Sequence, residues 1–190
     1  MRTPVLVEAC ANSLTSALAA QAGGAARVEL CSALIEGGVT PSAAVIELAR
    51  QRLDIKVNVL VRPRGGDFCY DDTEVAVMTR DIEFCRRAGV DGVVIGILTP
   101  DGSVDVQRTG ALVAAARPMQ VTFHRAFDMA ADADHALGDV LALGVERLLT
   151  SGQRGSAFEG RGLIANLVRR AGARLVVMPG AGIHEGNVRE

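Results

Sequence analysis

Short apolar runs alternate with amphipathic segments along the whole chain. The runs predict β-strands, and the segments between them repeat their apolar positions at the period of a helix. We predict strands at 4–10, 27–31, 56–62, 92–96, 119–125, 147–151 and 174–178, and helices at 13–22, 42–52, 72–87, 105–117, 134–143 and 156–171. Asn12 or Ser13 should cap the first helix, and Thr40, followed by Pro41, should cap the second. Regular alternation of this kind indicates an α/β protein with a parallel sheet.

The polar positions within the strands distinguish a barrel from an open sheet. In the strand at 119–125, the apolar residues point to one side, and Gln120, Thr122 and His124 point to the other. No G-x-G-x-x-G motif follows the first strand, which disfavours a dinucleotide-binding sheet. Inward-facing polar residues suit the mouth of a barrel, where they meet water and ligand. We therefore predict an α/β fold of the TIM (β/α)8 barrel type.

The chain supplies seven predicted strands, whereas such a barrel has eight. We expect residues 1–190 to form a single TIM-barrel domain that is truncated at the C-terminus, so that the eighth strand is missing. The alternative is an open seven-stranded barrel. Its unpaired strand edges would invite pairing with a second copy, which makes a homo-oligomer one expected partner arrangement.

Composition excludes several classes of function. The formal net charge is −2, and no basic cluster indicates nucleic-acid binding. No apolar segment has the length of a signal peptide or a membrane span, so we expect a cytoplasmic protein without a membrane partner. The four cysteines show no C-x-x-C spacing, and reduced thiols are expected.

Two neighbouring strands end in the same pattern, a glutamate followed two residues later by a cysteine. Glu8 and Cys10 share one side of the first strand, and Glu29 and Cys31 share one side of the second. Two close thiols could bind a soft metal ion such as Cu(I). Alternatively, each cysteine is a small buried apolar residue.

A third strand ends with two arginines. Arg62 and Arg64 bracket a proline and precede a Gly-Gly turn, a combination suited to binding a carboxylate or a phosphate. The alternative is that both arginines form salt bridges with Glu8, Glu29 or Asp67.

The fifth strand ends in a cluster of chemically active residues. His124 is a candidate general acid–base, with Asp128 as a second catalytic candidate and Arg125 as an anion binder. Alternatively, His124 is held structurally by Glu8 or Asp128. No Ser-His-Asp order is recognisable in the chain.

Later loops could hold a phosphate group. Gly180 and Gly182 follow the seventh strand, in the region where barrels often place a phosphate site, and Ser151 adds a hydroxyl after the sixth strand. The glycines could equally form an ordinary tight loop.

The chain resembles the CutC copper homeostasis proteins over essentially its whole length. Eight motifs carry the resemblance: V-E-A-C at 7–10, R-V-E-L-C at 27–31, E-G-G-V-T-P-S at 36–42, R-P-R-G-G-D-F at 62–68, D-G-V-V-I-G-I-L-T-P-D-G at 91–102, T-F-H-R-A-F-D at 122–128, L-T-S-G at 149–152 and M-P-G-A-G-I at 178–183. The resemblance implies a TIM barrel, a cytoplasmic location and copper handling with Cu(I) at cysteine. Cys69 departs from the family pattern, and so does the missing final strand.

Two functional hypotheses remain open. The first is copper homeostasis through binding of Cu(I) by Cys10 and Cys31, with His124 as a further candidate ligand. The second is an enzyme of the isomerase, lyase or hydrolase type that acts on a small anionic substrate, with or without a phosphate group. In that case Arg62 and Arg64 clamp the anion, while Glu29 and His124 move protons. No organic cofactor is expected in either case.

Overall fold

The structure, a computed structural model, describes residues 5–188. The chain divides into two compact units. The first takes in residues up to Asp67, with Asp71–Val94 and Ala114–Gln120, and the second takes in the remainder. Among the described residues, no helix is both long enough and apolar enough to cross a membrane.

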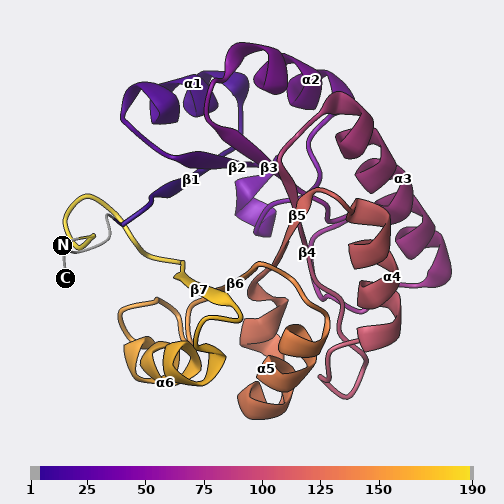
Figure 1. Cartoon of the computed structure of the whole chain (residues 1–190), viewed down its shortest axis with the longest axis vertical. Coiled ribbons are helices and arrows are strands. Elements are labelled where there is room, and N and C mark those ends of the chain that lie inside the picture. Colours follow the sequence, from indigo (N-terminus) through magenta and orange to yellow (C-terminus); the bar gives the residue numbers. More distant parts are fainter. Residues whose placement is uncertain (1–4, 189–190) are drawn as a thin grey trace. The chain divides into compact units, whose positions relative to one another are not determined.

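Four parallel strands form the sheet of the first unit, and they pair in chain order (Figure 1). They are β1 (Glu8–Ala11), β2 (Arg27–Leu30), β3 (Lys56–Leu60) and β4 (Gly92–Ile95), of which Ile95 belongs to the second unit. The helices between them are α1 (Leu14–Ala22), α2 (Ala43–Arg52) and α3 (Asp72–Ala88), with a short 3-10 helix, η1 (Leu34–Glu36), after β2. The register places Cys10 opposite Glu29, and Glu29 opposite Asn58.

Side-chain caps determine where these helices begin. The Ser13 hydroxyl caps α1, as predicted, and Asp71 caps α3 through a reciprocal bond with Glu74. The predicted cap of α2 was wrong, since Ser42 occupies that position. The Thr40 hydroxyl instead bonds to the backbone of Arg62, which ties the loop before α2 to the end of β3.

The second unit repeats the strand–helix pattern. Its strands β5 (Gln120–Phe123), β6 (Arg147–Thr150) and β7 (Val176–Pro179) pair in parallel and in chain order, although Gln120 belongs to the first unit. The other elements are α4 (Val106–Ala116), whose last three residues belong to the first unit, the 3-10 helix η2 (Arg125–Met129), α5 (Ala133–Ala142) and α6 (Arg161–Ala171).

Among the boundaries in this unit that differ from the prediction, two bear on the candidate site. The fifth strand ends at Phe123 rather than at Arg125, because the His124 ring caps η2 by accepting the Ala126 N–H. The sixth helix begins at Arg161 rather than at residue 156. Gly155 and Gly160 disfavour a helix in the preceding segment, and it forms a loop instead.

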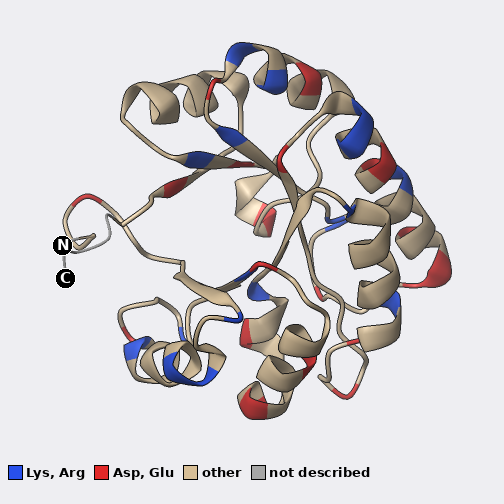
Figure 2. Cartoon of the chain, viewed as in Figure 1, with Lys and Arg blue, Asp and Glu red and all other residues tan. Residues whose placement is uncertain are grey.

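Aliphatic side chains fill the core of each unit. Val57, Val59 and Val93 are fully buried in the first, while Leu148 and Leu167 are fully buried in the second. Fully burying one such side chain contributes roughly 1.5–3 kcal/mol. On the solvent side, charges of both signs are interspersed along α2 and α3 (Figure 2).

The predicted fold class is confirmed: parallel strands in chain order alternate with helices, as in a TIM-type α/β barrel, and seven strands are described. The first predicted strand included Pro4, which lies outside the described residues, as do residues 189–190. The single truncated domain remains a prediction.

Candidate functional site

The first polar cluster contains the two predicted thiol ligands. Cys10 lies on β1 and is exposed to solvent. Cys31 comes directly after β2 and is fully buried. Their sulfurs lie 3.6 Å apart and share a hydrogen bond. The Cys31 thiol also lies 3.7 Å from the Ala11 carbonyl oxygen. The two-residue period of neighbouring strands thus brings both thiols to the same side of the sheet.

Contact between the thiols changes their acidity in opposite directions. The hydrogen bond to Cys31 raises the pKa of the Cys10 thiol, and partial desolvation of its sulfur, together with the negative charges of Cys31 and Glu8, raises it further although the residue as a whole is exposed. The same hydrogen bond lowers the pKa of Cys31. Cys31 is therefore the thiol of the pair that loses its proton more readily.

Glu29 is a buried carboxyl group beside this pair. Its Oε1 atom lies 4.0 Å from the Cys10 sulfur. Burial raises the pKa of Glu29 to about 8, with smaller contributions from Cys10 and Glu8. The carboxyl group consequently holds its proton at neutral pH and can donate a hydrogen bond, which suits the proton-transfer role predicted for it.

Glu8 has different neighbours. Its Oε2 atom accepts from the Arg27 guanidinium at 2.6 Å and from the Asn58 amide at 2.9 Å. The Oδ1 atom of Asn58 is buried and has no hydrogen-bond partner among the described residues. Neither Arg27 nor Asn58 was selected from the sequence as a site residue, although alternation places Arg27 on the side of Glu29 in the second strand and Asn58 on the side of Arg62 in the third.

Arg62 is buried, and its guanidinium forms hydrogen bonds with the loops that follow β2 and β3. It donates to the carbonyl oxygens of Glu36, Gly38 and Gly66 at 2.7–2.8 Å. These three contacts are with backbone carbonyl groups, whereas the alternative predicted from the sequence was a salt bridge to a carboxylate. Donors directed at three carbonyl groups hold the loops that follow β2 and β3, so this geometry does not favour the predicted role as an anion clamp.

Arg64 lies at the surface of the same unit. Its guanidinium pairs with Glu74 at 2.5 Å and with Asp67 at 3.0 Å. The hydrogen bond that Arg64 donates to Glu74 raises the pKa of Arg64. The Asp67 partner was the alternative foreseen from the sequence, and the two carboxylates already occupy the donors that were assigned to an anionic ligand.

In the second unit, His124 is buried after β5. Its Nδ1 atom accepts the Ala126 N–H, which leaves the ring proton on Nε2 in the neutral form. The ring lies 4.9 Å from the Phe68 ring and packs against Gly96. A Cβ atom on Gly96 would come within 2.6 Å of Nδ1, so a glycine is required there.

Asp128 anchors the loop after β6. Its carboxylate accepts from the Thr150 hydroxyl, from the backbone and hydroxyl of Ser151, from the Gln153 N–H and from the Arg125 guanidinium. Burial acts to raise the pKa of Asp128, but these hydrogen bonds outweigh it and lower the pKa. A carboxylate with its acceptor sites occupied is poorly placed to act as a base, which weighs against the catalytic role predicted for Asp128.

The other residues predicted for substrate binding lie near this anchor or after β7. Arg125 contacts both Asp128 and the Ser151 hydroxyl. The Gly180 N–H donates to the Thr150 carbonyl, and a Cβ atom on Gly182 would come within 3.0 Å of Ser156. The two glycines therefore pack against the loop after β6.

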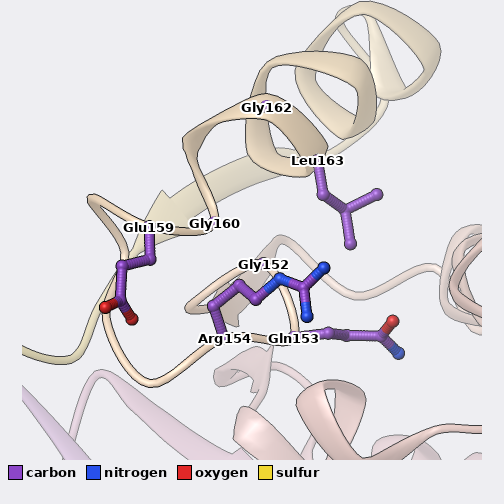
Figure 3. A pocket seen from close by; sticks show the side chains of 7 residues that line it. All are labelled: Gly152, Gln153, Arg154, Glu159, Gly160, Gly162 and Leu163. Carbon is purple, nitrogen blue, oxygen red and sulfur yellow. The ribbon is translucent and has the colours of Figure 1, made fainter.

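A pocket of about 320 Å³ opens beside the same loop, and its lining residues are Gly152, Gln153, Arg154, Glu159, Gly160, Gly162 and Leu163 (Figure 3). The Arg154 side chain extends toward Leu163, while the Glu159 carboxylate points away (Figure 3). The N-terminus of α6, at Gly160, has no side-chain cap. Arg154 was not selected from the sequence, although it lies in the predicted loop between the sixth strand and the helix that follows it.

The predicted residues thus form local groups. One group, on β1 and β2 and directly after β2, contains Glu8, Cys10, Glu29 and Cys31. The other, after β5 and β6, contains Arg125, Asp128 and Ser151. Convergence of Glu8, Glu29, Arg62 and His124 in one pocket remains a prediction. Within residues 5–188, no group of three or more His, Cys, Asp or Glu side chains could hold a metal ion, so the thiol pair could supply only two ligands.

Comparison with known proteins identifies the family. The sequence profile of the CutC family matches residues 5–190. A CutC family protein of Chromobacterium violaceum is 56% identical over 183 residues, which make up 96% of this chain and 74% of that protein. The "Copper homeostasis protein cutC homolog" of Mus musculus is 52% identical over 97% of this chain and 68% of its own length. A CutC crystal structure from Streptococcus agalactiae, 35% identical, covers 98% of this chain and 92% of its own with a TM-score of 0.92. The chain belongs to the CutC family.

Proposed function

We propose that this CutC chain takes part in copper homeostasis by binding Cu(I) between the sulfurs of Cys10 and Cys31. The observation that supports this most is the 3.6 Å separation of two free thiols on adjacent strands. Thiolate sulfur is a soft ligand, and soft ligands select Cu(I). Two sulfurs suffice for a linear ion, which suits a site without a third ligand.

Only a small rearrangement would admit the ion. With metal–sulfur bonds of about 2.3 Å, as for zinc thiolates, a linear ion needs sulfurs about 4.6 Å apart. The two sulfurs would therefore separate by about 1 Å from their present distance. Cys10 is exposed, so rotation of its side chain can supply that movement.

Two side chains beside the thiols, Glu29 and Arg27, would assist binding of Cu(I), which replaces the thiol protons. Both thiols lose their protons on binding, since thiolates are the ligands. Glu29 keeps its proton at neutral pH and lies 4.0 Å from the Cys10 sulfur, so it can donate a hydrogen bond to the thiolate that forms. Arg27 is paired with Glu8 and balances the charge of that carboxylate.

An anaerobic competition titration against a chromophoric Cu(I) chelator tests this proposal. We expect one Cu(I) per chain. The Cys10→Ser, Cys31→Ser double variant should no longer compete with the chelator for Cu(I). Cys69→Ser and Cys85→Ser are matched controls and should bind as the unmodified chain does. Binding by the double variant with unchanged stoichiometry and affinity would overturn the proposal.

A second candidate function is an enzyme acting on a small anionic substrate, and the pocket beside Arg154 favours it. Arg62 and Arg64 are committed to protein oxygens, whereas no hydrogen bond or ion pair is described for the Arg154 guanidinium among residues 5–188. The uncapped first turn of α6 offers backbone N–H groups at the same pocket.

Thermal shift with inorganic phosphate and small phosphate esters tests the second candidate. Arg154→Ala should abolish the stabilisation by ligand. Arg169→Ala, which removes an exposed arginine elsewhere on α6, should retain it. Equal shifts for both variants would exclude the Arg154 pocket as the anion site.

We also propose a cytoplasmic location, because a reduced thiol pair persists in a reducing compartment. Association into a homo-oligomer is proposed from the edge strands. Sedimentation velocity across a range of concentrations tests the oligomer.

A further inference from the structure

The two thiols of the pair differ in their access to solvent. Cys10 is exposed, whereas Cys31 is fully buried behind it. A reagent larger than water can therefore reach the Cys10 sulfur and not the Cys31 sulfur. The two sulfurs are nevertheless 3.6 Å apart, so a group attached to Cys10 lies within reach of Cys31.

We propose that Cys10 and Cys31 form a reversible disulfide, in which Cys10 reacts first with a low-molecular-weight disulfide and Cys31 then completes the bond. A disulfide needs sulfurs about 2.05 Å apart. Closing the present distance of 3.6 Å requires a movement of about 1.5 Å. Because Cys10 lies opposite Glu29 in the register, Cys31 is a diagonal neighbour of Cys10, and the backbone that follows β2 has to move together with the two side chains.

The exchange balances in two steps. The Cys10 thiolate attacks one sulfur of the small disulfide RSSR, a Cys10–S–S–R bond forms, and RS⁻ leaves. The Cys31 thiolate then attacks the Cys10 sulfur, the Cys10–Cys31 bond forms, and a second RS⁻ leaves. Two cysteine thiols are oxidised by two electrons, RSSR is reduced to two thiols, and the two protons pass to the leaving thiolates.

The remaining cysteines provide internal controls. Cys85 is fully buried within α3, so a reagent in solution does not reach its sulfur and it should resist exchange. Cys69 is half-buried in the loop before α3, and a mixed disulfide formed there should remain as such unless reduced. Only the Cys10–Cys31 pair combines one accessible sulfur with a second sulfur at 3.6 Å.

Oxidation would also control the proposed metal site. This consequence rests on the proposed function, because the disulfide uses both sulfurs that would hold Cu(I). Formation of the bond releases the ion, and bound Cu(I) in turn protects Cys10 from exchange. The disulfide itself requires no copper, so its test is made first on the metal-free protein.

The test treats the metal-free folded chain with glutathione disulfide, blocks the remaining thiols by alkylation, and measures intact mass and peptide masses. We expect a Cys10–Cys31 disulfide that carries no glutathione. Cys31→Ser should stop at one glutathione on Cys10, and Cys10→Ser should leave Cys31 reduced. Each reaction is compared with Cys85→Ser, which should behave as the unmodified chain.

Two results would overturn the proposal. One is a stable glutathione adduct on Cys10 while Cys31 remains present and reduced. The other is modification of Cys31 in the folded Cys10→Ser variant at the rate of Cys10 in the unmodified chain. A separate arm repeats the oxidation with one equivalent of Cu(I). If the disulfide forms without copper but Cu(I) gives no protection, the proposed copper site fails while the disulfide stands.

Discussion

Two carboxyl groups with largely buried side chains, one in each unit, have opposite electrostatic environments. Glu29 lies on β2 beside a thiol pair, and burial raises its pKa to about 8. Asp128 lies in η2 and accepts several hydrogen bonds from the loop after β6, which lower its pKa. One group keeps its proton at neutral pH, and the other keeps its charge.

The number of donors around each carboxyl explains the difference. Desolvation acts on both groups, but donors from Thr150, Ser151 and Arg125 stabilise the charged form of Asp128. The hydrogen-bond donor described for Glu29 is the weak donor of the Cys10 thiol, at 4.0 Å. A fully hydrogen-bonded carboxylate stabilises a loop, whereas a protonated carboxyl beside two sulfurs remains available for chemistry.

The largest effect is expected from Asp128→Ala. The change leaves the donors of the loop after β6 without their acceptor, and we expect the free energy of unfolding to fall by about 3–5 kcal/mol. Chemical denaturation measures this loss. Asp134→Ala, which removes an exposed carboxylate paired with Arg170, is the control and should cost less than about 1 kcal/mol. Equal losses for both variants would contradict the anchoring role.

The two carboxyls should give stability opposite dependences on pH. The folded pKa of Glu29 is raised from 4.5 to about 8, so the folded state binds more protons between these values and Glu29 makes stability fall as pH rises, by about 1.4 kcal/mol per unit. The pKa of Asp128 is lowered from 3.8, so its stabilising contribution is present above that value and is lost as pH falls through the lowered pKa.

Denaturation of Glu29→Gln and Asp128→Asn across this range separates the two contributions. The difference between the unmodified chain and Glu29→Gln should change steadily from about pH 5 to pH 8. The corresponding difference for Asp128→Asn should change only at acid pH. A difference for Glu29→Gln that is flat over the first range would mean that Glu29 ionises normally.

A pair of glycines tests how tightly the Asp128 loop is held. A Cβ atom on Gly160 would overlap the Ser151 carbonyl oxygen, whereas a Cβ atom on Gly162 would meet nothing within 4 Å. We expect Gly160→Ala to destabilise the protein by about 2–3 kcal/mol. Gly162→Ala should be neutral or stabilising by up to about 1 kcal/mol, because alanine favours the helix. Similar thermal midpoints for the two variants would show that the loop can move away.

The smallest effect on stability is expected from Cys10→Ser. Cys10 is exposed, and surface substitutions usually change stability by less than about 0.5 kcal/mol. The same variant should lose the Cu(I) site, so affinity and stability separate. A loss of stability as large as that of Asp128→Ala would indicate that the thiol pair is a structural element.

The sequence predicted the elements better than the contacts. The apolar runs containing Val57, Val59 and Val93 located the strands because buried parallel strands are continuously apolar. Alternation also placed Cys10 and Cys31 on the same side, since it depends only on the two-residue period.

Contacts that depend on loops could not be predicted in this way. Two carbonyl partners of Arg62 lie on η1 and its neighbouring turn, and the third lies in the loop after β3, all in segments without a periodic pattern. The pocket beside Arg154 exists because α6 starts late, at Gly160, where a close approach to the Ser151 carbonyl requires glycine. A close approach of this kind, between residues in different turns of the chain, cannot be predicted from the local pattern of apolar and polar residues.

X-ray absorption at the copper edge of the Cu(I)-loaded protein tests the central proposal most directly. Binding between Cys10 and Cys31 predicts a two-coordinate ion with two sulfur neighbours, and the signal should disappear in the Cys10→Ser, Cys31→Ser variant after the same loading and desalting. Cys69→Ser should give the spectrum of the unmodified chain. A spectrum dominated by nitrogen or oxygen neighbours, or one that persists in the double variant, would contradict the proposed site.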